Sequence, residues 1–283
     1  EAGGPEKAKE LLRRFWEINS KNGRCSPFQP TVFDKILGSK GSIEYSPCWQ
    51  MFDILSRMFS PYQWNPGHTN VFKDILEELI DFRVLQKARH VKLFICATNV
   101  LTGRLKVFEN AEITPEMILA SACLPYLYQA PEINGEYYWD GGYMGNPPIF
   151  PVIYNTGCQD VLIVQINPIN IPEVPRSATA IFDRINTLSF NSSLMREMRA
   201  IYFVTSLIEK GELDEAKYKH TFIHTIDAEE EMSRLTASSK MNLDMEFLNY
   251  LFEIGHEKAD AFLANHYDEI GRKSSTDLVA KFF

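Results

Sequence analysis

Apolar residues recur every three or four positions along several stretches of the chain, a spacing that predicts amphipathic helices. The expected helices cover residues 5–19, 47–59, 71–82 and 114–124, followed by two longer ones near 177–210 and 243–264. Pro5, Pro47 and Pro115 stand where the first helical position falls, which proline tolerates well. Asn70 precedes another helix and suits its N-cap.

Between these helices lie short apolar runs rich in β-branched and aromatic residues, which predict buried strands. They cover residues 91–97, 105–108, a segment ending at Trp139, 161–166 and 220–226. Helices and strands alternate up to about residue 168. This alternation predicts an α/β fold whose central, mostly parallel sheet has helices on both faces.

The composition is ordinary for a globular domain, with 45% hydrophobic and 23% charged residues among 283. The net charge of −8 argues against nucleic acid as a partner, because phosphate binding needs clustered Lys and Arg. It also argues against tight, purely electrostatic binding to anionic membranes. Transient contact with a lipid surface remains compatible with this composition.

Five cysteines stand at wide spacings, without a C-x-x-C pair or a zinc-ligand pattern. We therefore expect buried, reduced thiols in a reducing compartment. The expected location is the cytoplasm or the periphery of a membrane. No cofactor and no metal are expected.

The sharpest local feature is the turn Asp140-Gly141-Gly142, which follows a predicted strand. A carboxylate at the end of a strand lies on an exposed rim, where glycines leave the backbone free to bend. An ordinary tight turn has the same composition, so the tripeptide alone does not decide between the two interpretations.

The surroundings of Asp140 are more specific. They comprise residues 97–103 (ATNVLTG), 120–125 (ASACLP) and 142–148 (GYMGNPP), in that order along the chain. Together they resemble the patatin-like phospholipases. The resemblance covers about residues 1–168 and implies a three-layer α/β/α sandwich. Residues 184–201 also resemble an extension found in one bacterial branch of that family, so we expect a second, mainly helical region over 169–283.

The resemblance implies a lipid acyl hydrolase that uses a serine and an aspartate without a histidine. Asp140 takes the place of the general base, and Gly141 and Gly142 complete its turn. Asn146 lies in the loop that follows. A carboxylate base needs a raised proton affinity, and we expect the apolar neighbours Tyr138, Trp139 and Tyr143 to supply it.

No serine in the chain has glycine at both −2 and +2, so the G-x-S-x-G nucleophile loop of the family is not present. The glycine-rich loop that donates N–H groups to the oxyanion is not present either. We expect both, with the first strand of the sheet, upstream of Glu1. The chain alone is then catalytically incomplete. Ser121 is the best alternative nucleophile within it, although a packed helix-terminal serine is the simpler interpretation.

Two further functions stay open: a non-catalytic remnant that binds lipid or a partner, and an acyltransferase that uses the same acyl-enzyme. Other polar clusters are weaker candidates. His220 and His224 are expected on one face of a strand, without a third metal ligand placed by spacing. The acidic run 227–231 is expected to be a solvated turn, and His256-Glu257 solvated surface. The aromatic and Met residues at 48–64 are expected in the core, with a lipid-facing lid as the alternative.

Overall fold

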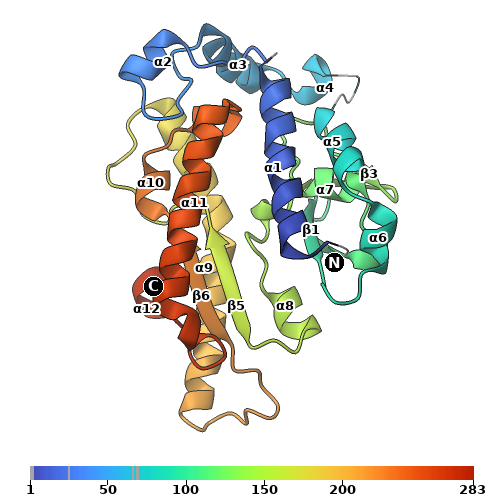
Figure 1. Cartoon of the computed structure of the whole chain (residues 1–283), viewed down its shortest axis with the longest axis vertical. Coiled ribbons are helices and arrows are strands. Elements are labelled where there is room, and N and C mark those ends of the chain that lie inside the picture. Colours follow the sequence, from blue (N-terminus) through green and yellow to red (C-terminus); the bar gives the residue numbers. More distant parts are fainter. Residues whose placement is uncertain (1–2, 25, 66, 68–69) are drawn as a thin grey trace. The chain divides into compact units, whose positions relative to one another are not determined.

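A computed structural model describes residues 3–24, 26–65, 67 and 70–283 of the chain. Figure 1 shows the order of its helices and strands. The chain forms two compact units. Unit 1 comprises residues 1–144 and 235–250, and unit 2 comprises residues 145–234 and 251–283.

Unit 1 is built from helices followed by a small sheet. Its helices are α1 (Gly4–Gly23), α2 (Val32–Leu37), α3 (Pro47–Met58), α4 (Pro61–Trp64), α5 (Val71–Leu79), α6 (Phe82–Lys87) and α7 (Pro115–Ser121). Single 3-10 turns lie at Asn110–Glu112, Gly141–Tyr143 and Ala237–Met241. The helix expected over 71–82 is thus two helices, because Asp81 accepts hydrogen bonds from the N–H groups of Arg83 and Val84 and starts a new one.

The sheet of unit 1 has the order β2-β1-β4-β3. The strands are β1 (Phe94–Asn99), β2 (Leu105–Glu109), β3 (Glu132–Ile133) and β4 (Glu136–Asp140). Every neighbouring pair in it is antiparallel, so the mostly parallel sheet expected from the sequence is wrong for this unit. The reason is local, since short turns join β1 to β2 and β3 to β4. Asn134 and Gly135 form the second turn with φ of 55° and 80°, the conformation that tight hairpins require.

Unit 2 holds the one parallel pair among the described strands, β5 (Asp160–Gln165) and β6 (Phe222–Asp227). The helix α9 (Ala178–Glu209) lies between them in the chain and makes the crossover that a parallel connection needs. Unit 2 also contains α8 (Phe150–Asn155), α10 (Glu229–Ser233), α12 (Leu278–Phe282) and a 3-10 turn at Tyr267–Glu269. The helix α11 (Met245–His266) begins in unit 1 and continues into unit 2.

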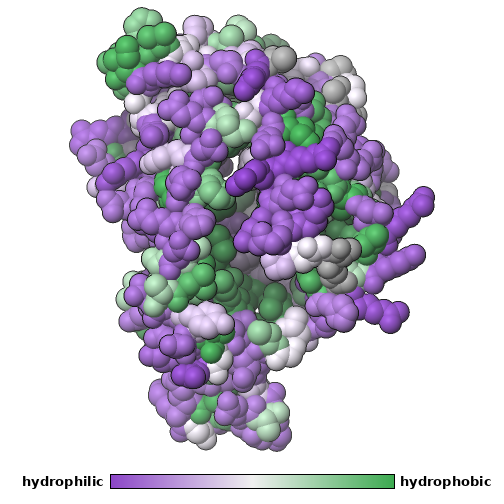
Figure 2. All heavy atoms as spheres, in the orientation of Figure 1, coloured by the Kyte–Doolittle hydropathy of each residue, from purple (hydrophilic) through white to green (hydrophobic). Residues whose placement is uncertain are grey.

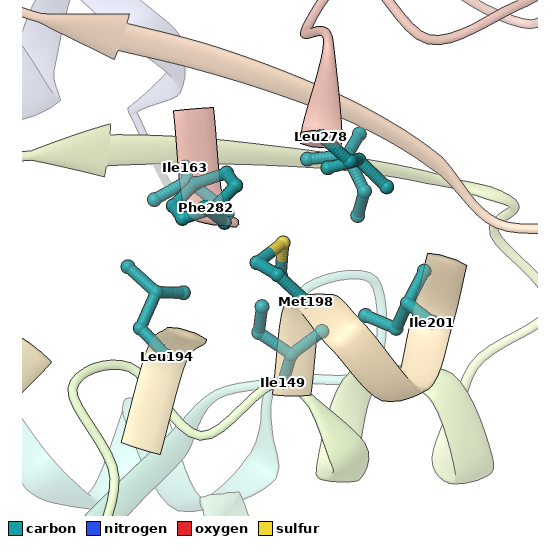
Figure 3. Packing of buried hydrophobic residues seen from close by; sticks show 8 residues of the cluster. Ile149, Ile163, Leu194, Met198, Ile201, Leu278 and Phe282 are labelled. Atoms are coloured by element: carbon teal, nitrogen blue, oxygen red, sulfur yellow. The ribbon is translucent and has the colours of Figure 1, made fainter. Parts of the chain in front are cut away.

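Each unit has its own apolar core. In unit 1, α7 packs against β1 and β4 around Phe108, Ile113 and Tyr138. In unit 2, Ile163 of β5 packs with Met198 of α9 and Phe282 of α12, as Figure 3 shows. Phe282 is fully buried, so α12 packs into the core of unit 2.

These two units divide the chain at positions other than residue 168, and β5 falls among the elements of unit 2. The assignment of residues 169–283 as an extension therefore stays a prediction.

Among the described cysteines, all four have free thiols, but only Cys123 is buried while Cys48 and Cys158 are exposed. Cys25 lies outside the described residues. In the described part of the chain, no helix is both long enough and apolar enough to cross a bilayer.

Candidate active site around Asp140

Asp140 is the last residue of β4, and two hydrogen bonds and one strand pairing fix its backbone. Its N–H donates to the carbonyl oxygen of Cys123 at 2.9 Å. Its carbonyl oxygen accepts a 2.8 Å hydrogen bond from Oγ1 of Thr98, and Ala97 is its partner in β1. The motifs at 97–103, 120–125 and 140–142 therefore meet at this one residue.

The turn after β1 is held by Asn99. Its Oδ1 accepts hydrogen bonds from the N–H groups of Leu101 and Thr102 at 3.1 and 2.9 Å. Its Nδ2 donates to Oε2 of Glu136 on β4 at 3.0 Å. Gly103 has a φ of 65°, which favours glycine. This turn thus fixes β1 against β4 and, with it, the position of Asp140.

The two glycines after Asp140 serve different purposes. The N–H of Gly142 donates to Oδ1 of Asp140 at 2.7 Å, which holds the carboxylate over the turn. Gly141 passes so close to β1 that a Cβ atom on it would lie 2.2 Å from the carbonyl oxygen of Cys96. Gly142 is not among the glycines with a positive φ. Close approach at Gly141 is what requires glycine.

The carboxylate of Asp140 is half-buried. Burial raises the pKa of Asp140, and the hydrogen bond from Gly142 opposes that rise without cancelling it. Burial also raises the pKa of Cys123 to about 12, with the charge of Asp140 as a second cause. The pKa of Tyr143 also rises to about 12, first through burial and then through the nearby Tyr126, Asp140 and Cys123. Asp140 thus lies among neutral groups and gains proton affinity, as a carboxylate base requires.

Ser121 is the last residue of α7. Its Oγ donates to the carbonyl oxygen of Ile118 at 2.8 Å, one turn earlier in the same helix. This is the usual arrangement of a helical serine, whose hydroxyl is hydrogen-bonded within its own helix. The structure therefore favours a packing role for Ser121.

Asn146 belongs to unit 2, where its contacts are with α9. Its N–H donates to Oγ of Ser193 at 3.2 Å, and the peptide bond to Pro147 is cis. Farther along the loop, Oε2 of Glu197 accepts from the N–H groups of Ile149 and Phe150 at 2.7 and 3.1 Å. The loop after the Asp140 turn is therefore tied to α9 through backbone groups.

A second polar cluster lies in unit 2 and is not predicted by spacing along the chain. The ring of His224 on β6 is 1% exposed, and its Nδ1 lies 2.9 Å from Oγ of Ser275. Its Nε2 lies 3.1 Å from Oδ1 of Asp160, which also accepts from the N–H of Gly271. The side-chain types are those of a hydrolase triad, but a general base must reach substrate. A buried ring with both nitrogens paired instead anchors the C-terminal segment to the sheet.

The remaining polar candidates have structural contacts. His220 precedes β6, and its ring lies 4.8 Å from that of Phe222 in a tilted arrangement, so it does not share a strand face with His224 as expected. The acidic run is not a solvated turn: Asp227 pairs with Lys281, and Glu231 with Lys258 at 2.7 Å. His256 is exposed, as expected. Within the described residues, no group of three or more His, Cys, Asp or Glu side chains has an arrangement that would hold a metal ion.

Comparisons with known proteins bear on the same part of the chain. The family model described as patatin-like phospholipase matches residues 3–153, which is more than half of the sequence. A comparison with curated proteins finds no match. The matched range includes β1, α7, β4 and the Asp140 turn.

Proposed function

Because the chain belongs to the patatin-like phospholipase family, we propose that it forms the larger part of a lipid acyl hydrolase in which Asp140 is the general base. The substrate class is a carboxylic ester of a lipid. The nucleophile in this proposal is a serine carried by a segment outside residues 1–283.

The observation that carries this proposal is the environment of the Asp140 carboxylate. It stands at the end of a strand, its backbone is fixed by Thr98 and Cys123, and its pKa is raised by burial. A carboxylate with these properties accepts the proton of a serine hydroxyl as that oxygen attacks an ester carbonyl. It then returns the proton to the leaving alcohol. Water then attacks the acyl-enzyme by the same steps: Asp140 accepts the proton of the water and returns it to the serine oxygen as the acid leaves.

Two features support a nucleophile outside these residues. None of the serines has the glycine spacing of a nucleophile elbow, and Ser121 is hydrogen-bonded within its own helix.

The second feature is an exposed apolar face on β5. The exposed fractions are 48% for Leu162, 68% for Val164 and 71% for Ile166, which directly follows the strand. Strands of a parallel sheet are normally buried on both faces. An upstream segment that adds a strand and a covering helix would bury these residues and complete the three-layer sandwich.

A fluorophosphonate probe tests the proposal, because it reacts only with an activated serine. The purified 283-residue chain should show no adduct by intact mass. A longer product of the same gene, extended upstream, should take up one probe per chain, and Asp140→Asn in it should slow labelling by about 100-fold or more. Ser121→Ala is the control and should label normally.

One outcome overturns the assignment of the nucleophile: a stoichiometric adduct on the 283-residue chain. Loss of that adduct in Ser121→Ala would move the nucleophile to Ser121. Equal labelling rates for the longer product with and without Asp140→Asn would remove the base role from Asp140.

A further inference from the structure

The short helix α2 buries its acidic residue and exposes its apolar residues, which is the reverse of what is expected of a helix on a water-facing surface. Its one acidic residue, Asp34, is buried at 3% exposure. Its four apolar residues are 64–72% exposed; these are Val32, Phe33, Ile36 and Leu37. Exposed apolar residues are common singly, but a cluster of four on one helical turn and a half marks a contact surface.

Hydrogen bonds to Asp34 hold α2 in this orientation. Oδ2 accepts from N and Oγ1 of Thr31 at 2.7 and 2.6 Å, which closes a capping box at the start of the helix. Oδ1 accepts from the N–H of Tyr45 at 2.7 Å. Because the buried carboxylate is satisfied on both oxygens, rotation of α2 to bury its apolar side would break these bonds. The exposure of the apolar residues is therefore built into the fold.

The next helix, α3, has the same property. Met51, Ile54, Leu55 and Met58 follow the spacing of one helical face and are 41–69% exposed. A flanking side of α3 makes aromatic contacts, since the ring of Phe52 lies 5.0 Å from that of Phe28 and 6.3 Å from that of Trp64. The expectation that the aromatic and Met residues at 48–64 belong to the core is wrong for five of them, which are 44–69% exposed: Met51, Met58, Phe59, Tyr62 and Trp64.

The two apolar faces belong to one region of unit 1. Tyr45, which binds Asp34 of α2, stands two residues before α3 begins at Pro47. Figure 2 shows hydrophobic atoms gathered at the upper left, over the position that α2 has in Figure 1. We call the eight exposed apolar residues of α2 and α3 the α2–α3 face.

The charges around this face fit a neutral lipid surface. Residues 31–59 contain three acidic and three basic side chains, although the whole chain has a net charge of −8. Asp34 is buried and Asp53 pairs with Arg57 at 2.8 Å, so the acidic groups of both helices are turned inward or neutralised. Tyr62 and Trp64, which follow α3 in the chain, are both exposed. Aromatic residues with a polar tip are typical of the boundary between lipid and water.

We propose that the α2–α3 face docks the protein on the surface of a zwitterionic lipid bilayer, with the apolar side chains inserted among the head groups and upper acyl chains. The proposal rests on the proposed function in one respect, since a lipid ester substrate lies in such a surface. Helices with one apolar face lie in the plane of the interface, and their binding grows with the apolar area buried. A neutral face meets no electrostatic barrier there.

Co-sedimentation of the 283-residue chain with large phosphatidylcholine vesicles tests the proposal, since binding requires no turnover. The unsubstituted chain should bind in a lipid-dependent manner. The double variant Phe33→Glu, Ile36→Glu should bind at least tenfold more weakly, and Met51→Glu, Met58→Glu should behave likewise. Leu101→Glu, at another exposed apolar residue of unit 1, is the matched control and should bind normally. Circular dichroism of each variant verifies that it is folded.

Three results would overturn the proposal: no binding to vesicles, binding that the α2 and α3 variants retain, or a concentration-dependent dimer that Phe33→Glu, Ile36→Glu abolishes while vesicles stay unbound. The last would assign the face to a second copy of the chain. Failure here is distinguishable from failure of the proposed function. Vesicle binding without probe labelling of the longer gene product counts against the hydrolase alone, and labelling without vesicle binding counts against the docking face alone.

Discussion

Gly141 lies so close to β1 that a Cβ atom at this position would stand 2.2 Å from the carbonyl oxygen of Cys96. Cys96 cannot retreat easily, because β1 is paired with β2 on one side and β4 on the other. Gly141→Ala should therefore lower the free energy of unfolding by about 1–3 kcal/mol, as overpacked sites do. Urea denaturation measures this.

Gly255→Ala is the matched control for that change. Gly255 lies within α11, and a Cβ atom there would meet nothing within 4 Å. Alanine should raise the free energy of unfolding by about 0.5–1 kcal/mol because it favours the helix. Equal urea midpoints for Gly141→Ala and the unsubstituted chain would contradict the close approach.

Replacing Asp140 by asparagine should not destabilise the protein at neutral pH. Burial raises the folded-state pKa of Asp140 above its ordinary value of 3.8, so ionisation costs stability as the pH rises through the folded pKa. Asparagine removes this cost and still accepts the hydrogen bond from Gly142. The melting temperature of Asp140→Asn at pH 7 should equal or exceed that of the unsubstituted chain.

The difference should shrink below pH 3.8, where the aspartate is neutral in both the folded and unfolded states. Thermal unfolding at a series of pH values is the measurement. A melting temperature for Asp140→Asn well below the unsubstituted value at pH 7 would mean that the ionised carboxylate stabilises the fold, contrary to its burial.

His224→Leu should destabilise unit 2, because it leaves Asp160 and Ser275 without the ring nitrogens they contact. An unsatisfied buried polar group costs about 1–3 kcal/mol. Denaturant unfolding gives the value, and His256→Leu, at an exposed histidine, should change stability little. Ser275→Ala should leave probe labelling of the longer gene product unaltered. Loss of labelling in Ser275→Ala would instead indicate that this cluster is catalytic.

Asp34→Ala should destabilise unit 1 by about 1.5–3 kcal/mol, since it removes hydrogen bonds to a charged group from Thr31 and Tyr45. Asp53→Ala is the control, because its exposed i,i+4 pair with Arg57 contributes only about 0.2–0.5 kcal/mol. Chemical denaturation compares the two. Similar losses for both variants would argue that the buried carboxylate does not hold α2 in place.

Local patterns predicted most elements of the fold. The apolar run at 161–166 gave β5, and helical spacing gave α9 and α11 within a few residues. The A-T-N and D-G-G motifs located the candidate site, because their residues bond to one another across adjacent strands. The direction of the strands was not predictable from the runs themselves. It depends on the turns at 100–104 and 134–135, whose glycines were the available signal.

Contacts between distant residues could not be predicted. His224 meets Ser275 and Asp160 across separations of 51 and 64 residues, and nothing in their spacing indicates it. The side of α3 that faces solvent cannot be predicted either, for a similar reason. Met51 and Met58 have the spacing of a core-facing stripe, but both are exposed, and the aromatic contacts of α3 are made by Phe52 instead. Hydrophobic periodicity identifies a face without saying which way it turns.

The strand pair β5–β6 has one consequence for handling the protein. The outer edge of β6 is covered, since Thr276 donates its N–H to the carbonyl oxygen of Ile223. Among the described strands, none pairs with the other edge of β5, which also exposes Leu162 and Val164. Unpaired apolar edges recruit strands from other molecules. Preparations of these 283 residues should therefore precipitate at concentrations where a chain extended upstream stays in solution, and a lysine at Val164 should delay that aggregation.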